Sequence, residues 1–337
     1  MVTIYDIAKE SGLSASTVSR ALTGRGYVSE RSRQKVLAVA EGLGYIPNQT
    51  ARTLRSNITN KIMLCIPDIM NPYYFAMIKE VTEALEDYQY NVLLTYTMHS
   101  PEKELEILKS LKGGYVDGLI FGSFNYTDTL IAAIKETGLP TVITSFYSGS
   151  DNDDFYDCIY VDQPEAAYVA TKHCIENGHR RIAFLGGDPE EQNTIERYTG
   201  YKRALSEAGI DLDEDLVINA DFTLEGAERE YARFIHSGND VTAVLACNDL
   251  MGVGCMNACK SAGISVPDEV SIVSLDNTEY CVSTDPQMTS VDMMQGPIGA
   301  RAVKAVMDRI NNKRNYRKDL TFYPNLIVRD SVKVIAS

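Results

Sequence analysis

The side chains best suited to chemistry in this sequence are polar groups that follow short apolar runs in its longer, second part. Asn248 and Asp276 each follow such a run, and Arg197 offers a fork of five donors to hydroxyl or carboxylate oxygens. Together they supply the donors and acceptors that the hydroxyls of a polyol require. Tyr73 and Tyr74 add aromatic faces for stacking on a sugar or a planar ring, with core packing as the alternative. These residue types predict that the chain binds a small polar molecule.

Signatures of catalysis are missing from the sequence. It holds no G-x-S-x-G elbow, no Walker loop and no H-E-x-x-H motif, and its four histidines are scattered. Cys255 and Cys259 lie four residues apart without a nearby histidine, which favours a packed helix face over a metal site. We therefore predict no catalytic residue, no metal and no cofactor. A cytosolic enzyme acting on sugars is a rival interpretation, with Asp249 and Asp276 as its only evident acid–base pair.

Charge is divided unequally along the 337 residues, whose net charge is −14. Residues 1–60 carry eight basic and four acidic side chains, a net +4, and the remainder carries 24 basic and 42 acidic ones, a net −18. A basic head on an acidic body attracts phosphate at one end only. No signal peptide or membrane-spanning run is evident, and the odd number of cysteines fits a reducing compartment, so we expect a cytoplasmic chain.

Three short helices are predicted in residues 1–46. Thr3 with Asp6 resembles a capping box, Gly12 supplies a tight turn, and Ser14 caps a second helix. A third helix follows Ser29, ends at Gly44, and buries apolar side chains at these positions: Val36, Val39, Ala40 and Leu43. These spacings form a helix-turn-helix, although a three-helix bundle without a nucleic-acid role is the alternative. On the second helix Ala15, Ser16 and Arg20 would point outward, and Arg20 can reach guanine O6 and N7.

Residues 47–60 read as a hinge. Pro47 can open a helix of barely two turns, which is too short to be stable alone in water. Leu54, flanked by Arg52 and Arg55, would be exposed on that helix. Its two interpretations are a wedge that unstacks a base step in the minor groove and a contact with the chain's own body.

The residues from Val2 to Ala8, Leu13 to Leu22 and Gly44 to Leu54 closely resemble the lactose/galactose repressor (LacI-type) family of transcription regulators. That resemblance implies a homodimer on near-palindromic operator DNA, often with a central C-G step, and makes Leu54 the wedge of a paired hinge helix. The predicted DNA contacts are Thr3, Ser14, Ala15, Ser16, Thr17, Arg20, Asn48, Arg52, Leu54 and Arg55.

In residues 61–337, short β-rich runs alternate with helical patterns. The predicted strands are Ile62–Ile66, Asn91–Thr95, Gly118–Phe121, Thr141–Thr144, Ile182–Leu185, Ala243–Ala246 and Val270–Leu275. Such alternation indicates parallel doubly wound sheets. We therefore expect an all-α helix-turn-helix head and an α/β body of two parallel-sheet lobes with a ligand cleft between them. The body also resembles the family's effector domain, and through it the periplasmic sugar-binding proteins.

By the same resemblance, the expected effector contacts are Tyr73, Tyr74, Ser145, Phe146, Asn193, Arg197, Phe222, Asn248, Asp276 and Met293. Ser145-Phe146 stands where many members read Asp-Arg, and Met293-Met294 replaces the usual Gln-Pro. Both departures remove polar contacts, so we expect an effector that is less hydroxylated, larger or partly apolar compared with a monosaccharide.

The predicted mechanism is that of a homodimeric repressor whose effector closes the cleft, shifts the hinges and changes DNA binding by about 1–3 kcal/mol. A solute receptor with a vestigial head is the rival from another class. Control by a phosphorylated partner protein is left open by the sequence.

Overall fold

The computed structural model describes residues 2–24, 26–45, 58–123, 125–147 and 154–335. Residue contacts divide the chain into two compact units, Met1–Ile58 and Thr59–Ser337. Among the described residues, no helix is both long and apolar enough to cross a membrane. We describe the two units, the head and the body, separately.

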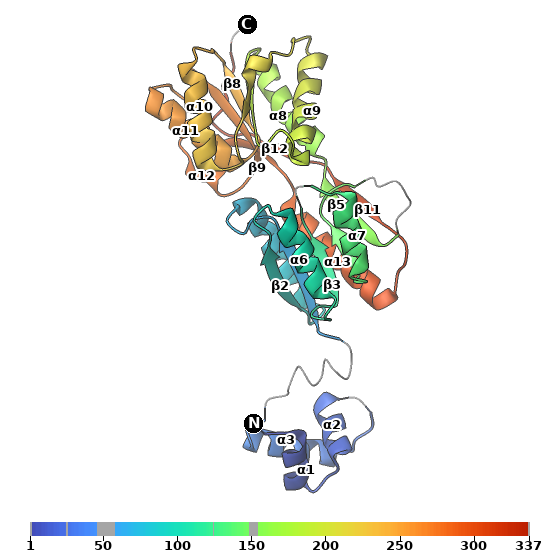
Figure 1. The fold of residues 1–337 in the computed structure, drawn as a ribbon. Coiled ribbons are helices and arrows are strands. Elements are labelled where there is room, and N and C mark those ends of the chain that lie inside the picture. Colours follow the sequence, from blue (N-terminus) through green and yellow to red (C-terminus); the bar gives the residue numbers. More distant parts are fainter. Residues whose placement is uncertain (1, 25, 46–57, 124, 148–153, 336–337) are drawn as a thin grey trace. The chain divides into compact units, whose positions relative to one another are not determined.

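The head is built from three helices, α1 (Ile4–Ser11), α2 (Ala15–Thr23) and α3 (Glu30–Gly42) (Figure 1). Each begins at a hydroxyl side chain that accepts a backbone N–H of the first turn; these caps are Thr3, Ser14 and Ser29. Their shared core consists of Ile7, Val18, Ala21, Val36 and Ala40. The prediction that Leu43 is buried was wrong: α3 ends one residue earlier, and Leu43 is 38% exposed.

The body contains two six-stranded sheets. The first has the order β11-β5-β4-β3-β1-β2, and all its neighbouring strands are parallel. Its strands are β1 (Lys61–Ile66), β2 (Asn91–Tyr96), β3 (Gly118–Phe121), β4 (Thr141–Ile143), β5 (Tyr156–Val161) and β11 (Asp319–Phe322). Its helices are α5 (Phe75–Glu86), α6 (Pro101–Leu111), α7 (Asp128–Glu136) and α13 (Gln295–Asn312), with the 3-10 turn η1 (Pro72–Tyr74) before α5. We call this part lobe 1.

Alternate residues of β1 face two different cores, which shows that helices cover both faces of the sheet. Ile62 and Leu64 pack into the core shared with α5 and α13, whereas Met63 and Cys65 pack into the core shared with α6 and α7. The doubly wound architecture predicted for this part of the chain is therefore confirmed.

Lobe 2 has the strand order β12-β10-β9-β8-β6-β7, and only the β10–β12 pair is antiparallel. Its strands are β6 (Ile182–Gly186), β7 (Val217–Asn219), β8 (Ala243–Ala246), β9 (Ser271–Asp276), β10 (Thr289–Asp292) and β12 (Asn325–Ile327). Its helices are α8 (Gln163–Glu176), α9 (Gln192–Glu207), α10 (Leu224–His236), α11 (Asp249–Ala262), the short α12 (Tyr280–Ser283) and the 3-10 turn η2 (Glu214–Leu216). Helices α8 and α9 pack together on one side of the sheet, and α10 and α11 on the other (Figure 1).

All seven predicted strands are present, with ends that differ by one residue at most. Five further strands were not predicted: β5, β7, β10, β11 and β12. Three of them lie at or next to the edge of the lobe 2 sheet: β7 and β12 are edge strands of three residues, and the buried β10 carries Thr289 and Ser290, so none of them forms a long apolar run.

Candidate functional site: a polar helix face in the head and a polar cluster in the body

The face predicted to read DNA begins at the N-terminus of α2, where hydroxyl groups bond to one another. Ser14 Oγ lies 2.9 Å from Ser16 Oγ and 2.8 Å from Thr17 Oγ1, and it also accepts the Thr17 backbone N–H at 3.2 Å. Ala15 beside them is half-buried. At the start of α1, Thr3 caps the helix and its N–H donates to Asp6 Oδ2 at 2.8 Å. The hydrogen bonds from Thr3 lower the pKa of Asp6.

Arg20 is the basic residue that the α2 face offers to a ligand. Its side chain is exposed, and it makes no hydrogen bond or ion pair with any residue that the structure describes. Its aliphatic stem lies along Gly26, where an added Cβ would come within 3.4 Å of Arg20 Cδ. The guanidinium group is thus free to bond to a base edge or a phosphate. Four other predicted DNA contacts lie outside the described residues: Asn48, Arg52, Leu54 and Arg55.

In the body, a polar cluster lies where the ends of several elements meet. Tyr73, in η1, accepts a hydrogen bond from the Gln295 side chain at the start of α13. Burial raises the pKa of the Tyr73 hydroxyl, and the carboxylate of Asp276 raises it further, while Arg197 and Gln163 act in the opposite direction. The residues that act on the Tyr73 hydroxyl therefore come from both lobes: Gln295 from lobe 1, and Asp276, Arg197 and Gln163 from lobe 2.

Arg197 forms the centre of this cluster on the lobe 2 side. It is 5% exposed, and its Nε donates to Gln163 Oε1 at 2.9 Å while its Nη1 donates to the backbone oxygen of Cys247. Its Cζ atom lies 5.8 Å from the centre of the Phe222 ring. The Phe222 ring in turn covers Gly187, since a Cβ there would lie 2.0 Å from it.

Asp276 ends β9 in an unusual conformation. Its φ is +114°, a region that residues with a Cβ rarely adopt, and Asn277 follows with φ +54°. Its Oδ1 atom is buried without a hydrogen-bond partner among the described residues. Burial raises the pKa of this carboxyl group well above its usual range, although Arg197 opposes the shift.

Asp249 holds the segment after Asp276 in place. Its oxygens accept hydrogen bonds from Ser274 Oγ at 2.5 Å and Ser290 Oγ at 2.8 Å. They also accept the N–H of Thr278 at 2.6 Å and its hydroxyl at 2.7 Å. Asp249 is only 1% exposed, and these donors occupy its carboxylate, so it holds the surrounding segments in place. It is therefore poorly suited to act with Asp276 as the acid–base pair of an enzyme.

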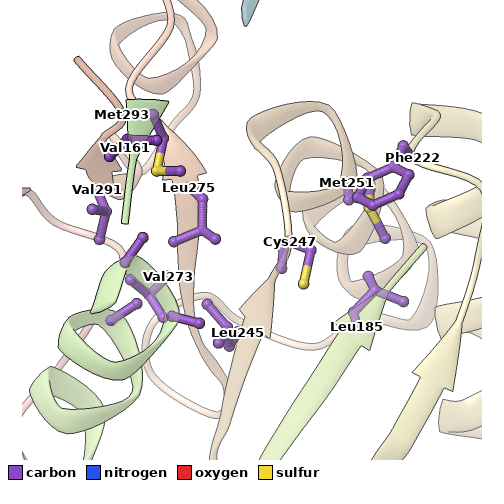
Figure 2. Close-up of a cluster of buried hydrophobic side chains, with 14 of the residues drawn as sticks. Val161, Leu185, Phe222, Leu245, Cys247, Met251, Val273, Leu275, Val291 and Met293 are labelled. Carbon is purple, nitrogen blue, oxygen red and sulfur yellow. The ribbon is translucent and has the colours of Figure 1, made fainter. Parts of the chain in front are cut away.

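Buried apolar side chains form a floor in lobe 2, part of which Figure 2 draws. Labelled side chains from the strands β6, β8, β9 and β10 include Leu185, Leu245, Leu275 and Val291, all of them fully buried. Phe222 lies near Met251 at one side of this floor (Figure 2).

Comparison with known proteins identifies the family of the chain. The profile described as "Bacterial regulatory proteins, lacI family" matches residues 3–48, and the profile "Periplasmic binding protein-like domain" matches residues 171–332. Catabolite control protein A of Priestia megaterium is 32% identical over 334 residues, which cover 98% of this chain and 99% of that protein. The HTH-type transcriptional repressor PurR of Photobacterium profundum is 30% identical, with 99% of both chains covered. The chain belongs to the lacI family of bacterial regulatory proteins.

A solved structure agrees with this membership. The transcriptional regulator CelR in its cellobiose complex is 28% identical, with a TM-score of 0.75, and the likeness covers 98% of this chain and all of that one. This lacI-family regulator therefore has a helix-turn-helix head and a body of two α/β lobes. Its relatives are transcription regulators, as predicted.

Three residues predicted to contact the effector have other roles in this lacI-family chain. Asn248 caps α11 through Oδ1, which accepts the Met251 N–H at 2.7 Å, and its Nδ2 donates to the Phe222 carbonyl at 2.9 Å, so each polar atom of the amide already makes one bond to the protein. Met293 is fully buried in the floor of lobe 2 (Figure 2) and offers no surface to a ligand. Its identity therefore carries no argument about the hydroxyl content of the effector. Tyr74 is 6% exposed and packs in the apolar core, and its contact with the effector stays a prediction.

Three other predicted effector contacts are described by the structure but are not joined to the polar cluster by any described hydrogen bond. Phe146 is 45% exposed, and its ring centre lies 5.3 Å from that of Tyr160. Ser145 and Asn193 are half-buried, and none of the described hydrogen bonds joins either residue to Tyr73 or Arg197. Their role in effector binding stays a prediction.

The sequence analysis missed three residues in or near the polar cluster: Gln163, Gln295 and Glu191. Gln163 follows Asp162, the cap of α8, and Gln295 directly follows the Met293-Met294 pair that had already drawn attention. Glu191 precedes α9, its Oε2 atom is buried without a partner among the described residues, and burial beside Asp188 raises its pKa to about 7. A glutamine or glutamate carries no distinctive spacing signal, so only the fold could reveal these three.

Proposed function

We propose that this lacI-family protein is an operator-binding transcription repressor that a sugar or sugar derivative controls from the polar cluster around Tyr73 and Arg197. The observation that carries the proposal is the pairing of two features in one chain. One is a capped helix-turn-helix that presents an arginine side chain without a bond to any described residue. The other is a buried polar cluster whose acceptors lack partners within the same described ranges. The repressor name of PurR and the cellobiose bound to CelR support the two halves of this function.

In the head, Arg20 would supply sequence discrimination and the residues around it would set the position of α2 in the major groove. A bidentate arginine–guanine contact contributes about 1–3 kcal/mol of discrimination. The contacts assigned to phosphate or base edges on α1 and α2 are Thr3, Ser14, Ala15, Ser16 and Thr17. Asn48, Arg52, Leu54 and Arg55 would complete them from the hinge.

We further propose that the protein acts as a homodimer, so that two heads meet an inverted repeat. The edge strand β2 supports this, because it pairs only with β1 and leaves Leu93 and Tyr96 exposed. Met98, two residues after β2, is exposed as well, and so is Phe75 at the start of α5. Long exposed edges with apolar side chains are uncommon in monomers.

The experiment is selection of bound duplexes from a random DNA pool by the full chain at near-physiological salt. An inverted repeat with a common half-site would support the proposal, and the variant Arg20→Ala should then recover a weaker or altered half-site. Arg203→Ala, which changes an arginine on the body that pairs with Glu165, serves as the control and should recover the wild-type sequence. Recovery of unrelated sequences by the wild-type chain would favour the solute-receptor alternative.

A further inference from the structure

The acceptors left without partners in the polar cluster indicate what a ligand must bring. Gln295 is 7% exposed, its amide nitrogen is spent on the Tyr73 hydroxyl, and its Oε1 atom has no partner among the described residues. Asp276 Oδ1 is likewise buried and unpartnered, and its charge acts on the same Tyr73 hydroxyl. A buried acceptor without a donor is costly, so a ligand that supplies N–H or O–H groups at this place is favoured.

Two carboxyl groups of the cluster, those of Asp276 and Glu191, lie near Arg197. Arg197 is the cation that acts on Tyr73 and Asp276, and two of its donor nitrogens already bond to Gln163 and to the Cys247 carbonyl. Burial raises the pKa of both carboxyl groups, and each has a buried oxygen without a partner among the described residues. A bound cation would favour the ionised form of these groups and pair with it, whereas a bound anion would disfavour that form.

We propose that the effector is a polyol that carries a protonated amine, of the amino sugar class, and that its ammonium group binds Asp276 and Gln295. This inference rests on the proposed function, since it names the ligand class of the same site. An ammonium group has three donors and no acceptor, so it can satisfy both Asp276 Oδ1 and Gln295 Oε1. A neutral sugar would need two separate hydroxyl groups for the same two oxygens and would bring no positive charge to pair with Asp276. The carboxylate of a sugar acid has none and would be repelled.

Calorimetric titration of the full chain with matched sugars tests this proposal. Glucosamine, glucose and glucuronate form one set, and galactosamine, galactose and galacturonate form another. Within each set the amino sugar differs from the neutral sugar at C2, and the acid differs from it at C6. We expect at least one amino sugar to bind 10-fold or more tightly than its neutral counterpart, with the acid weakest. Tighter binding of a neutral sugar or a sugar acid, or no binding of either amino sugar, would overturn the proposal.

Two variants show where the preference arises. Asp276→Asn removes the negative charge and should abolish the preference for the amine, whereas Gln295→Glu adds a carboxylate at the second acceptor and should increase it. Asp240→Asn changes a carboxylate 91% exposed on lobe 2 and should leave all affinities unchanged. Loss of the preference in all three variants would mean that Asp276 and Gln295 are not its source.

Binding of the selected operator duplex is measured on the same samples. A chain that holds its operator but rejects amino sugars refutes only the ligand class. A chain that selects no operator refutes the proposed function itself, whichever sugar it binds.

Discussion

Removal of the Asp157 carboxylate should destabilise the body of the protein strongly. Asp157 in β5 is fully buried and receives Arg309 Nη2 at 2.7 Å and Arg314 Nη2 at 2.5 Å, and the Lys318 N–H bonds to it at 2.8 Å. Both guanidinium groups are at least 95% buried. In Asp157→Asn the buried Arg309 loses its ion pair with Asp157, and Arg314 keeps its pair with Asp308. The loss of one member of a buried pair costs about 3–5 kcal/mol.

Urea unfolding measures this cost. It is followed by circular dichroism because the chain has no tryptophan to serve as a fluorescent probe. Asp308→Asn is the matched control, since Asp308 also bonds to Arg314, at 2.6 Å, but is 27% exposed. Its loss should cost only about 1 kcal/mol. If Asp157→Asn unfolded within about 1 kcal/mol of wild type, the buried cluster would not stabilise the fold as we reason.

The difference in unfolding free energy between wild type and Asp157→Asn should change with pH in a predictable direction. Burial alone would raise the pKa of Asp157, but hydrogen bonds from Arg314 and Arg309 outweigh it and hold that pKa below its usual value. A carboxyl group with a lowered pKa in the folded state stabilises the fold above its unfolded pKa, about 3.9, and loses that contribution on acidification. The gap between wild type and Asp157→Asn should therefore shrink as the pH falls below about 4, and a gap that widened would contradict the assignment.

Three further substitutions test local parts of the account. Gly200→Ala would place a Cβ 1.9 Å from the Pro164 carbonyl where α8 meets α9, so thermal unfolding should show a loss of about 3 kcal/mol. Gly187→Ala would push a Cβ to 2.0 Å from the Phe222 ring; it should cost about 1–3 kcal/mol in urea unfolding and weaken effector binding in calorimetry. Ser14→Ala removes the cap of α2, so the operator affinity measured by fluorescence anisotropy should fall, because the helix loses about 1 kcal/mol of stability.

The local signals of the head could be predicted from the sequence because they depend on neighbouring residues. A hydroxyl at a helix start, as at Thr3 and Ser14, and a glycine at the turn of residue 12 act within a few positions of the chain. The same holds for the apolar runs that form β1, β3 and β8, which are buried on both faces. The helix-turn-helix and the two sheets follow from such signals.

The polar cluster in the body could not be predicted in full, because it is formed by contacts between residues that are far apart in the sequence. An asparagine after a strand suits both a ligand and a helix cap, and only the position of the Met251 N–H assigns Asn248 to the cap. Met293 follows β10, a strand that was not predicted, so the side of the sheet that it faces could not be assigned. Gln295 bonds to a residue 222 positions away. Pairings of this kind are fixed by the fold.

The measurement that tests the central claim most directly is operator affinity in the presence and absence of a small-molecule fraction from cells, with wild-type protein and with Arg197→Met. The account predicts that the fraction changes the wild-type affinity by about 5–150-fold, equivalent to about 1–3 kcal/mol of coupling, and leaves the affinity of the variant unchanged. Thermal unfolding of the variant confirms that it is folded. An equal response of a folded variant would show that the site around Arg197 does not control the head, and would contradict the account.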